Sequence, residues 1–190
     1  MWSDIWQGAL LASPLFIGLL VHGLVMKYRV LPGLAVPIDR GAHFRGKRLF
    51  GDNKTYRGFM AMAVGTGIGF VLLGQAVSGG RLERLSLLPA GLMALMLGMA
   101  VGTVAMLAEL PNSTIKRQLD LPPGQQMKGL SRLTFLVLDQ VDILMGAWLV
   151  LAFVVSPTFG LVLGSFLFVY RGHQMITLVG HRMGMRATRH

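Results

Sequence analysis

The chain has 190 residues, of which 53% are hydrophobic and only 14% are charged. Soluble domains carry roughly 25% charged residues, so this composition excludes an ordinary soluble fold and favours a membrane protein. The 18 Lys and Arg residues outnumber the 8 Asp and Glu residues, but they lie between apolar runs, which is typical of loops beside anionic lipid and not of a nucleic-acid-binding protein.

Five apolar runs are candidates for helices that cross a bilayer, which needs about 20 residues per helix. They cover residues 5–26, 58–77, 87–108, 133–155 and 159–179, and the last run is clearly apolar only to Tyr170. Glycines recur in these runs at spacings that let membrane helices approach closely. We therefore predict one all-α domain over residues 1–190, a polytopic integral membrane protein with five transmembrane helices.

The positions of the cations predict how these helices are oriented. Sixteen of the 18 Lys and Arg residues fall in the segments 27–57 and 109–132 and in the tail from Arg171, which alternating spans place on one side. Because positively charged loops stay in the cytoplasm, we expect the N-terminus outside and the C-terminus inside. The expected location is the inner or plasma membrane, with two polar cytoplasmic loops at 27–57 and 109–132.

The first polar loop combines cations, glycines and small polar groups just before the second apolar run. Its end reads Gly51-Asp52-Asn53-Lys54-Thr55-Tyr56-Arg57-Gly58, and a dense basic stretch precedes it from Asp39 to Arg48. Such a set is suited to holding phosphate. The alternative is a simple topology signal, which needs only charge and leaves the interleaved Asp39, Asp52 and Asn53 unexplained.

The second polar loop begins with an acid at the membrane boundary. It reads Glu109-Leu110-Pro111-Asn112-Ser113-Thr114-Ile115-Lys116-Arg117, and Pro122-Pro123-Gly124 then turns the chain back. A helix end with basic anchors would also explain this pattern.

Two acids lie inside the fourth apolar run. Asp139 and Asp142 are three residues apart, which places both carboxylates on one face of a helix. An acid at the centre of a span costs about 2.5–3.5 kcal/mol, and two neighbouring carboxylates repel each other unless a cation or proton lies between them. Two interpretations are open: an ion pair with Lys or Arg of a nearby loop, or a site for a divalent metal ion.

Three blocks of the sequence, taken together, resemble the motifs of one family. The segment from Pro37 to Gly58 resembles the first cytoplasmic motif of the CDP-archaeol synthases, a branch of the membrane cytidylyltransferases that includes the CDP-diacylglycerol synthases. Ser113-x-x-Lys116-Arg117 followed by Pro123-Gly124 resembles their second motif, and Leu138-Asp139-Gln140-Val141-Asp142 their third. The resemblance covers residues 37–146.

The resemblance implies that CTP and a membrane lipid phosphate are converted to a CDP-lipid and pyrophosphate, with Mg²⁺ as cofactor. It implies that Asp139 and Asp142 bind the metal, with Glu109 as a further ligand, and that Lys54, Lys116 and Arg117 hold phosphates. The expected substrate-binding residues are Asp39, Arg48, Asp52, Asn53, Thr55, Arg57, Asn112 and Ser113. The alternatives are another membrane lipid phosphotransferase or kinase, and a small ion-coupled transporter that uses the acid pair as a relay.

Overall fold

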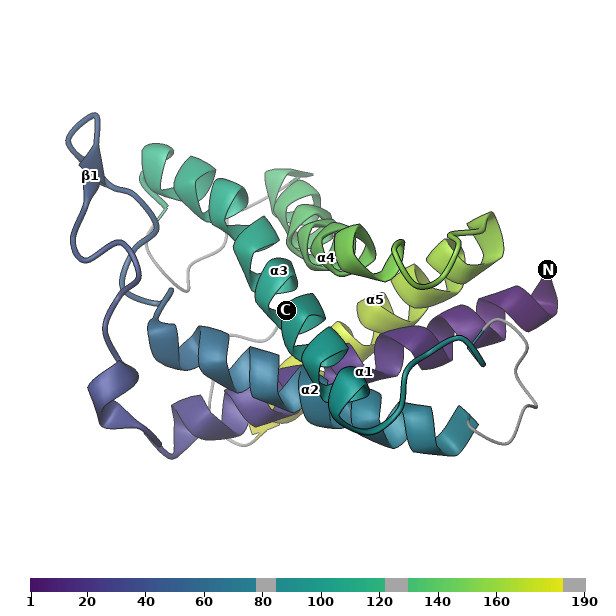
Figure 1. Ribbon diagram of the computed structural model, residues 1–190. Helices are drawn as coiled ribbons and strands as arrows, with labels where there is room; N and C mark the ends of the chain where they lie inside the picture. The colour runs from purple at the N-terminus through teal and green to yellow at the C-terminus, as the bar shows by residue number, and fades with distance from the viewer. Residues whose placement is uncertain (78–84, 122–129, 183–190) are drawn as a thin grey trace.

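The chain folds into a bundle of long helices with one polar loop projecting from one end (Figure 1). The structure is a computed structural model that describes residues 1–77, 85–121 and 130–182. Its elements are α1 (Trp2–Lys27), the short 3-10 helix η1 (Pro32–Leu34), β1 (His43–Phe44), β2 (Lys47–Arg48), α2 (Tyr56–Val77), α3 (Gly91–Gln118), α4 (Leu130–Leu151) and α5 (Phe159–Arg182). The predicted all-α class is therefore confirmed apart from one two-residue β-ladder in the loop.

The apolar runs predicted four of the five helix starts to within three residues. The prediction that residues 109–132 form a polar loop was wrong in part. Helix α3 starts at Gly91 and continues through Pro111 to Gln118, so residues 109–118 are helical. Hydropathy marks where a helix leaves the hydrocarbon, not where its hydrogen bonds end, and the polar turns after Ala108 continue the same helix. Helix α4 ends at Leu151, one turn before the predicted Val155.

In the described part of the chain, α1, α2 and α3 are long and apolar enough to cross a membrane. Helices α4 and α5 contain shorter apolar segments, Gln140–Leu151 and Phe159–Gly172. These helices make the protein a membrane protein. The predicted number of five transmembrane helices and their orientation stay predictions.

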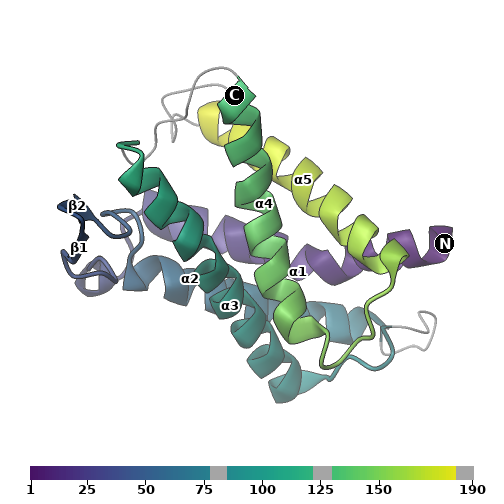
Figure 2. The ribbon, with the colours of Figure 1, turned by 90° about the horizontal axis from the view of Figure 1, so that it is seen from above.

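The helices form a ring that is tightly packed at four of its five contacts. Helix α1 packs between α2 and α5, and α3 packs between α2 and α4, whereas α4 and α5 touch only lightly (Figures 1 and 2). The core inside the ring contains fully buried side chains such as Leu11, Phe70, Val101 and Leu161. Because α2 begins and α3 ends beside the polar loop, the charged motifs of both helices lie at the same end of the bundle.

Candidate active site

The first polar loop is closed at its neck by backbone hydrogen bonds. The amide of Ile38 donates to the carbonyl of Lys54 over 2.8 Å, and the amide of Tyr56 donates to the carbonyl of Val36 over 3.1 Å. Inside the neck, β1 and β2 pair antiparallel through the two-residue turn Arg45-Gly46. Both turn residues have positive φ, 52° and 78°, as a type I′ hairpin requires. The loop is therefore a folded unit and not a flexible basic tether.

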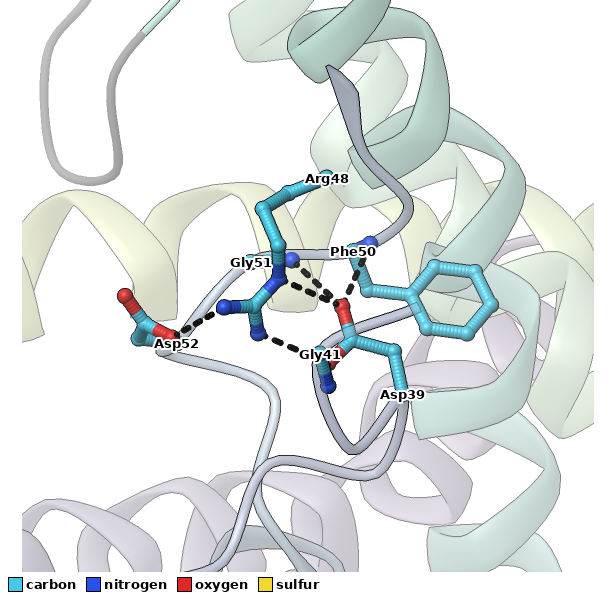
Figure 3. Close-up of polar contacts among 6 residues, drawn as sticks. All are labelled: Asp39, Gly41, Arg48, Phe50, Gly51 and Asp52. Atoms are coloured by element: carbon cyan, nitrogen blue, oxygen red, sulfur yellow. Dashed lines mark hydrogen bonds and ion pairs between the residues drawn. The ribbon is translucent and has the colours of Figure 1, made fainter. Parts of the chain in front are cut away.

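Asp39 organises this loop from its centre (Figure 3). Its buried carboxylate accepts hydrogen bonds from the Arg48 guanidinium at 2.8 Å and from three backbone amides at 3.0–3.1 Å, those of Gly41, Phe50 and Gly51. Burial alone would raise the pKa of Asp39, but the bonds from Arg48 and the amides outweigh it and lower the pKa from 3.8 to about 2. Asp39 is therefore a fixed anion at neutral pH.

Arg48 joins Asp39 to the exposed tip of the loop. Its guanidinium also pairs with Asp52 at 3.0 Å, and these two carboxylates raise the pKa of Arg48. Figure 3 shows the guanidinium between Asp39 on one side and Asp52 on the other. Asp52 is 73% exposed and Asn53 is exposed beside it, so both side chains are accessible to a ligand. Direct binding of substrate by Asp39, Arg48, Asp52 or Asn53 stays a prediction.

The last residues of the loop begin α2. The hydroxyl of Thr55, a residue that is 4% exposed, accepts a hydrogen bond from the amide of Gly58 at 3.2 Å, so it caps the first turn of the helix. Arg57 lies in that turn, and its Nε is buried without a hydrogen bond to any described residue. The structure thus shows a structural role for Thr55 and places a guanidinium at the positive end of a helix dipole.

Two ion pairs attach the loop to α3. Lys54 pairs with Glu109, and both side chains are mostly buried, at 18% and 20% exposed. Lys47 of the hairpin donates to the carbonyl of Gln118 at 2.8 Å and pairs with Asp120 at 2.6 Å. A lysine on the final carbonyls of a helix stabilises its C-terminus, so the hairpin also fixes the end of α3.

The helical conformation of residues 109–118 arranges the second motif on one face. Glu109, Asn112 and Lys116 follow one another at spacings of three and four, which brings them into one stripe along α3. Asn112 is buried at 6% exposed, while Glu109 and Lys116 are half-buried. Ser113 and Arg117 form the adjacent stripe, and the Arg117 guanidinium donates to the carbonyl of Leu121.

The third motif meets this stripe through the packing of α4 on α3. A side-chain carbon at Gly146 would lie 2.6 Å from the carbonyl oxygen of Val104 and 2.8 Å from Cβ of Ala108, so the two helices approach each other closely there. Asp142 is half-buried one turn earlier on the same face of α4, and Glu109 follows Ala108 directly. The two helices run antiparallel, so Asp142 lies at the level of Glu109. The side chain of Asp139 lies outside the described residues.

The ion pair joins Lys54 of the loop to Glu109 of α3, and Asp142 lies on the face of α4 that packs on α3. The comparison with known proteins gives the same family as the motifs. The sequence model of the CarS-like family, described as CDP-archaeol synthase, matches residues 13–190. The chain belongs to the CDP-archaeol synthase family.

Relatives within this family resemble the chain at different coverage. The CDP-archaeol synthase of Pyrococcus furiosus is 41% identical over 110 residues, which is 57% of this chain and 60% of that relative. The CDP-archaeol synthase of Methanoculleus marisnigri is 30% identical over 162 residues, 81% of this chain and 89% of that relative. The chain therefore spans only about 60% of the length of the Pyrococcus relative.

A solved structure shares the fold. It is an intramembrane enzyme for archaeal membrane lipids biosynthesis, with a TM-score of 0.63 and 24% identity, covering 89% of this chain and 91% of that chain. The family predicted from the three sequence blocks is confirmed.

The oxygen donors at the CDP-archaeol synthase motifs fit Mg²⁺. Protein sites for this ion usually supply one or two carboxylates and leave the other positions to water and phosphate oxygens. Asp142 and Glu109 can supply two carboxylates, and the described residues contain no cluster of three His, Cys, Asp or Glu side chains that would form a closed cage. The donor set therefore suits a metal that is shared with a phosphate ligand.

Sequence reasoning missed the hairpin and the contacts it makes with α3. The Arg45-Gly46 turn carries a weak signal, because a glycine at the second turn position favours a type I′ hairpin. The pair between Lys47 and Asp120 carries no sequence signal, since its partners lie 73 residues apart. Pro123 and Gly124, which contribute to the second family motif, lie outside the described residues.

Proposed function

We propose that this protein is a CTP-dependent cytidylyltransferase that condenses CTP with a membrane lipid phosphate, giving a CDP-lipid and pyrophosphate. The observation that carries the proposal is the ion pair that joins Lys54 of the loop to Glu109 of α3, beside the face of α3 on which the Asp142-bearing helix α4 packs. Membership of the CDP-archaeol synthase family and the names of its relatives support the same reaction.

The reaction is an exchange at the α-phosphorus of CTP. An oxygen of the lipid phosphate attacks this phosphorus and forms a new P–O bond, while the bond to the bridging oxygen breaks and pyrophosphate leaves with its electrons. A phosphate monoester has its second pKa near 6, so the nucleophile is already an anion at pH 7. No side chain has to act as nucleophile or strong base, which agrees with a site made of carboxylates, lysines and arginines.

The side chains of the site offset the repulsion between two phosphate anions. Lys54, Lys116 and Arg117 supply cations on the loop and on the end of α3, and the start of α2 adds the positive end of its dipole. Asp142 and Glu109, with Asp139, would hold Mg²⁺. When bound, this ion neutralises phosphate oxygens and stabilises the charge on the departing pyrophosphate. A phosphate bound by Lys54 would compete with Glu109 for this lysine and would leave the Glu109 carboxylate free to serve as a metal ligand.

We place the site on the cytoplasmic side of a five-helix transmembrane bundle in the cell membrane, with the N-terminus outside. The support is the positive charge of the loop and of the end of α3, because such segments stay in the cytoplasm. As acceptor we propose first a glycerol phosphate with ether-linked archaeal chains, since the relatives are named CDP-archaeol synthases.

One assay tests the reaction and the side of the membrane. Sealed vesicles that contain the protein are supplied with labelled CTP, Mg²⁺ and either the ether-lipid phosphate or phosphatidic acid, and CDP-lipid and pyrophosphate are measured. We expect both products in equal amounts, from inverted vesicles and not from right-side-out vesicles, because CTP does not cross the bilayer. Loss of the signal on chelation of Mg²⁺ is expected as well. No CDP-lipid with either acceptor would rule out the synthase, and phosphorylation of a lipid alcohol would favour a kinase.

A further inference from the structure

The residues that follow α1 are exposed although most of them are apolar. Every residue from Lys27 to Val36 is exposed, and this segment 27–36 contains two cations and no acid. It lies beside the end of α1, at the lower left of Figure 1. Exposed apolar surface beside charged groups marks a contact with a partner or with a membrane. The large apolar side chains of the segment are 36–67% exposed: Tyr28, Val30, Leu31, Leu34 and Val36.

Backbone hydrogen bonds fix the segment in this conformation. The amide of Val30 donates to the carbonyl of Val25 over 3.1 Å and ends α1, and the amide of Leu34 donates to the carbonyl of Leu31 over 3.0 Å. Arg29 and Leu31 have positive φ, 51° and 55°, which residues other than glycine keep only where the surrounding structure holds them. The apolar side chains are therefore held at the surface by a folded backbone.

The exposed aromatic residues of α1 indicate where this segment lies relative to a bilayer. Helix α1 is long and apolar enough to cross a membrane, and Trp6 and Tyr28 are 63% and 67% exposed. At 1.5 Å per residue they are separated by about 33 Å along the helix, close to a hydrocarbon core of about 30 Å. Exposed Trp and Tyr side chains are typical of the two membrane–water interfaces. With Trp6 at one interface, Tyr28 lies at the other, so the chain enters the head-group layer there.

We propose that the segment 27–36 is a docking surface for anionic lipid. Its apolar side chains contact the upper part of the acyl chains, and Lys27 and Arg29 bind the phosphates of the head groups. Two cations without an acid complement an anionic leaflet. A second copy of the chain would bring the same cations to a symmetric contact, so charge disfavours self-association through this surface. The proposal holds whether or not the candidate site makes a CDP-lipid.

Docking of this segment also fixes the height of the candidate active site. The amide of Tyr56 donates to the carbonyl of Val36 over 3.1 Å, and the amide of Ile38 donates to the carbonyl of Lys54 over 2.8 Å. The end of the docked segment is therefore bonded directly to the stretch of chain that carries Lys54. Lys54 lies beside the layer that contains the phosphates of membrane lipids.

The first experiment measures the depth of the segment in a bilayer. The chain has no cysteine, so Leu34→Cys in the full-length protein gives a single site for a polarity-sensitive fluorescent label. Asp120→Cys, at an exposed position just after α3, is the control. The vesicles contain phosphatidylcholine, phosphatidylglycerol and lipids with a nitroxide near the head group. We expect the nitroxide to quench the label at position 34 and to leave the label at position 120 bright.

Two results of this experiment would overturn the proposal. A label at position 34 that emits as it does in water would place the segment outside the bilayer. A label that is shielded from water but is not quenched by the nitroxide lipids would show that protein, such as a second copy of the chain, covers the segment.

The second experiment tests the charge with a matched pair of arginines. Arg29 and Arg45 are both exposed and have nearly the same φ, 51° and 52°, which asparagine tolerates. Arg45 belongs to the turn after β1, which lies on the opposite side of the loop in Figure 1. With the label at position 34, the quenching by phosphatidylglycerol that carries a nitroxide is compared with the quenching by an equally labelled phosphatidylcholine.

We expect phosphatidylglycerol to be the preferred neighbour of the label. Arg29→Asn should reduce this preference about fivefold, the contribution of one cation near the membrane surface. Arg45→Asn should keep the preference within about twofold, because the charge of a distant exposed group is screened. Equal quenching by both lipids in the Leu34→Cys protein, or the same reduction in both arginine variants, would overturn the proposal.

Discussion

Two ion pairs on the same loop differ in how completely each carboxylate is satisfied. The carboxylate of Asp39 is fully buried and accepts bonds from Arg48 and from three backbone amides of its own loop. The carboxylate of Glu109 belongs to α3, is partly exposed, and meets Lys54 across the junction between loop and helix. The first pair is held by several hydrogen bonds within its own loop. The second joins two long side chains, which can separate without breaking any backbone hydrogen bond.

Because of this difference, the two ion pairs are expected to have different roles. A buried charge with several fixed partners loses too much when a ligand competes for it, because its desolvation is then uncompensated. Lys54 and Glu109 are also mostly buried, but among the described residues each is held by this one ion pair, and a phosphate and a metal ion would replace it with charges of the same sign. Asp39 is therefore expected to position the loop, while Lys54 and Glu109 are expected to meet the substrates.

The largest effect is expected from removing the cation of the second pair. Lys54→Met keeps the length of the side chain but leaves the phosphates without this charge. We expect kcat/KM for CTP to fall by about 100-fold to 1,000-fold, the usual loss when one preorganised electrostatic group is removed. Initial rates of pyrophosphate release measure it.

The hairpin offers a matched control for that substitution. Lys47→Met removes the cation of an exposed pair with Asp120 and one bond to the last carbonyl of α3, for which the expected change in rate is at most about tenfold. A Lys54→Met protein that turns over as fast as Lys47→Met would place Lys54 outside the site.

A smaller effect is expected from the first pair. Asp39→Ala leaves the Arg48 guanidinium and three amides without their acceptor, so the loop loosens and turnover falls about tenfold through misplaced groups. Trypsin should then cleave the loop at Arg45 or Arg48 in the membrane-embedded protein, with little cleavage in the wild type. Asp120→Ala, which affects an exposed carboxylate, should leave the protection intact. Full protection in Asp39→Ala would show that the neck bonds alone hold the loop.

The low pKa of Asp39 sets the pH range in which this protection is lost. A carboxyl with a pKa of about 2 in the folded loop and 3.8 in the unfolded chain stabilises the fold above pH 3.8. The contribution is lost as the pH falls from there toward 2. Near neutral pH Asp39 stays ionised, so the titration of Asp39 should leave no inflection in the pH profile of the proposed reaction.

The helices were more predictable than the loop for a physical reason. Membrane helices satisfy their backbone bonds locally, so apolar runs alone indicated α1, α2 and α5 closely. The loop depends on bonds between distant residues, such as Arg48 with Asp39 and Lys54 with Glu109, and charge composition does not specify which partners meet. The extension of α3 past Pro111 was missed because the apolar run stops at Ala108, although the spacing of Glu109, Asn112 and Lys116 already fits one helix face.

The smallest effect concerns the anion of the second pair, where two roles of Glu109 give different results. As a metal ligand, Glu109 contributes to Mg²⁺ affinity, and we expect Glu109→Gln to raise the Mg²⁺ concentration at half-maximal rate about fivefold, equivalent to about 1 kcal/mol. As a counter-ion only, its loss would free Lys54 and lower KM for CTP without moving the Mg²⁺ dependence. Titrating Mg²⁺ at fixed CTP, and CTP at saturating Mg²⁺, separates the two. An unchanged Mg²⁺ dependence would leave Glu109 with Lys54 alone and leave metal binding to the acids of α4.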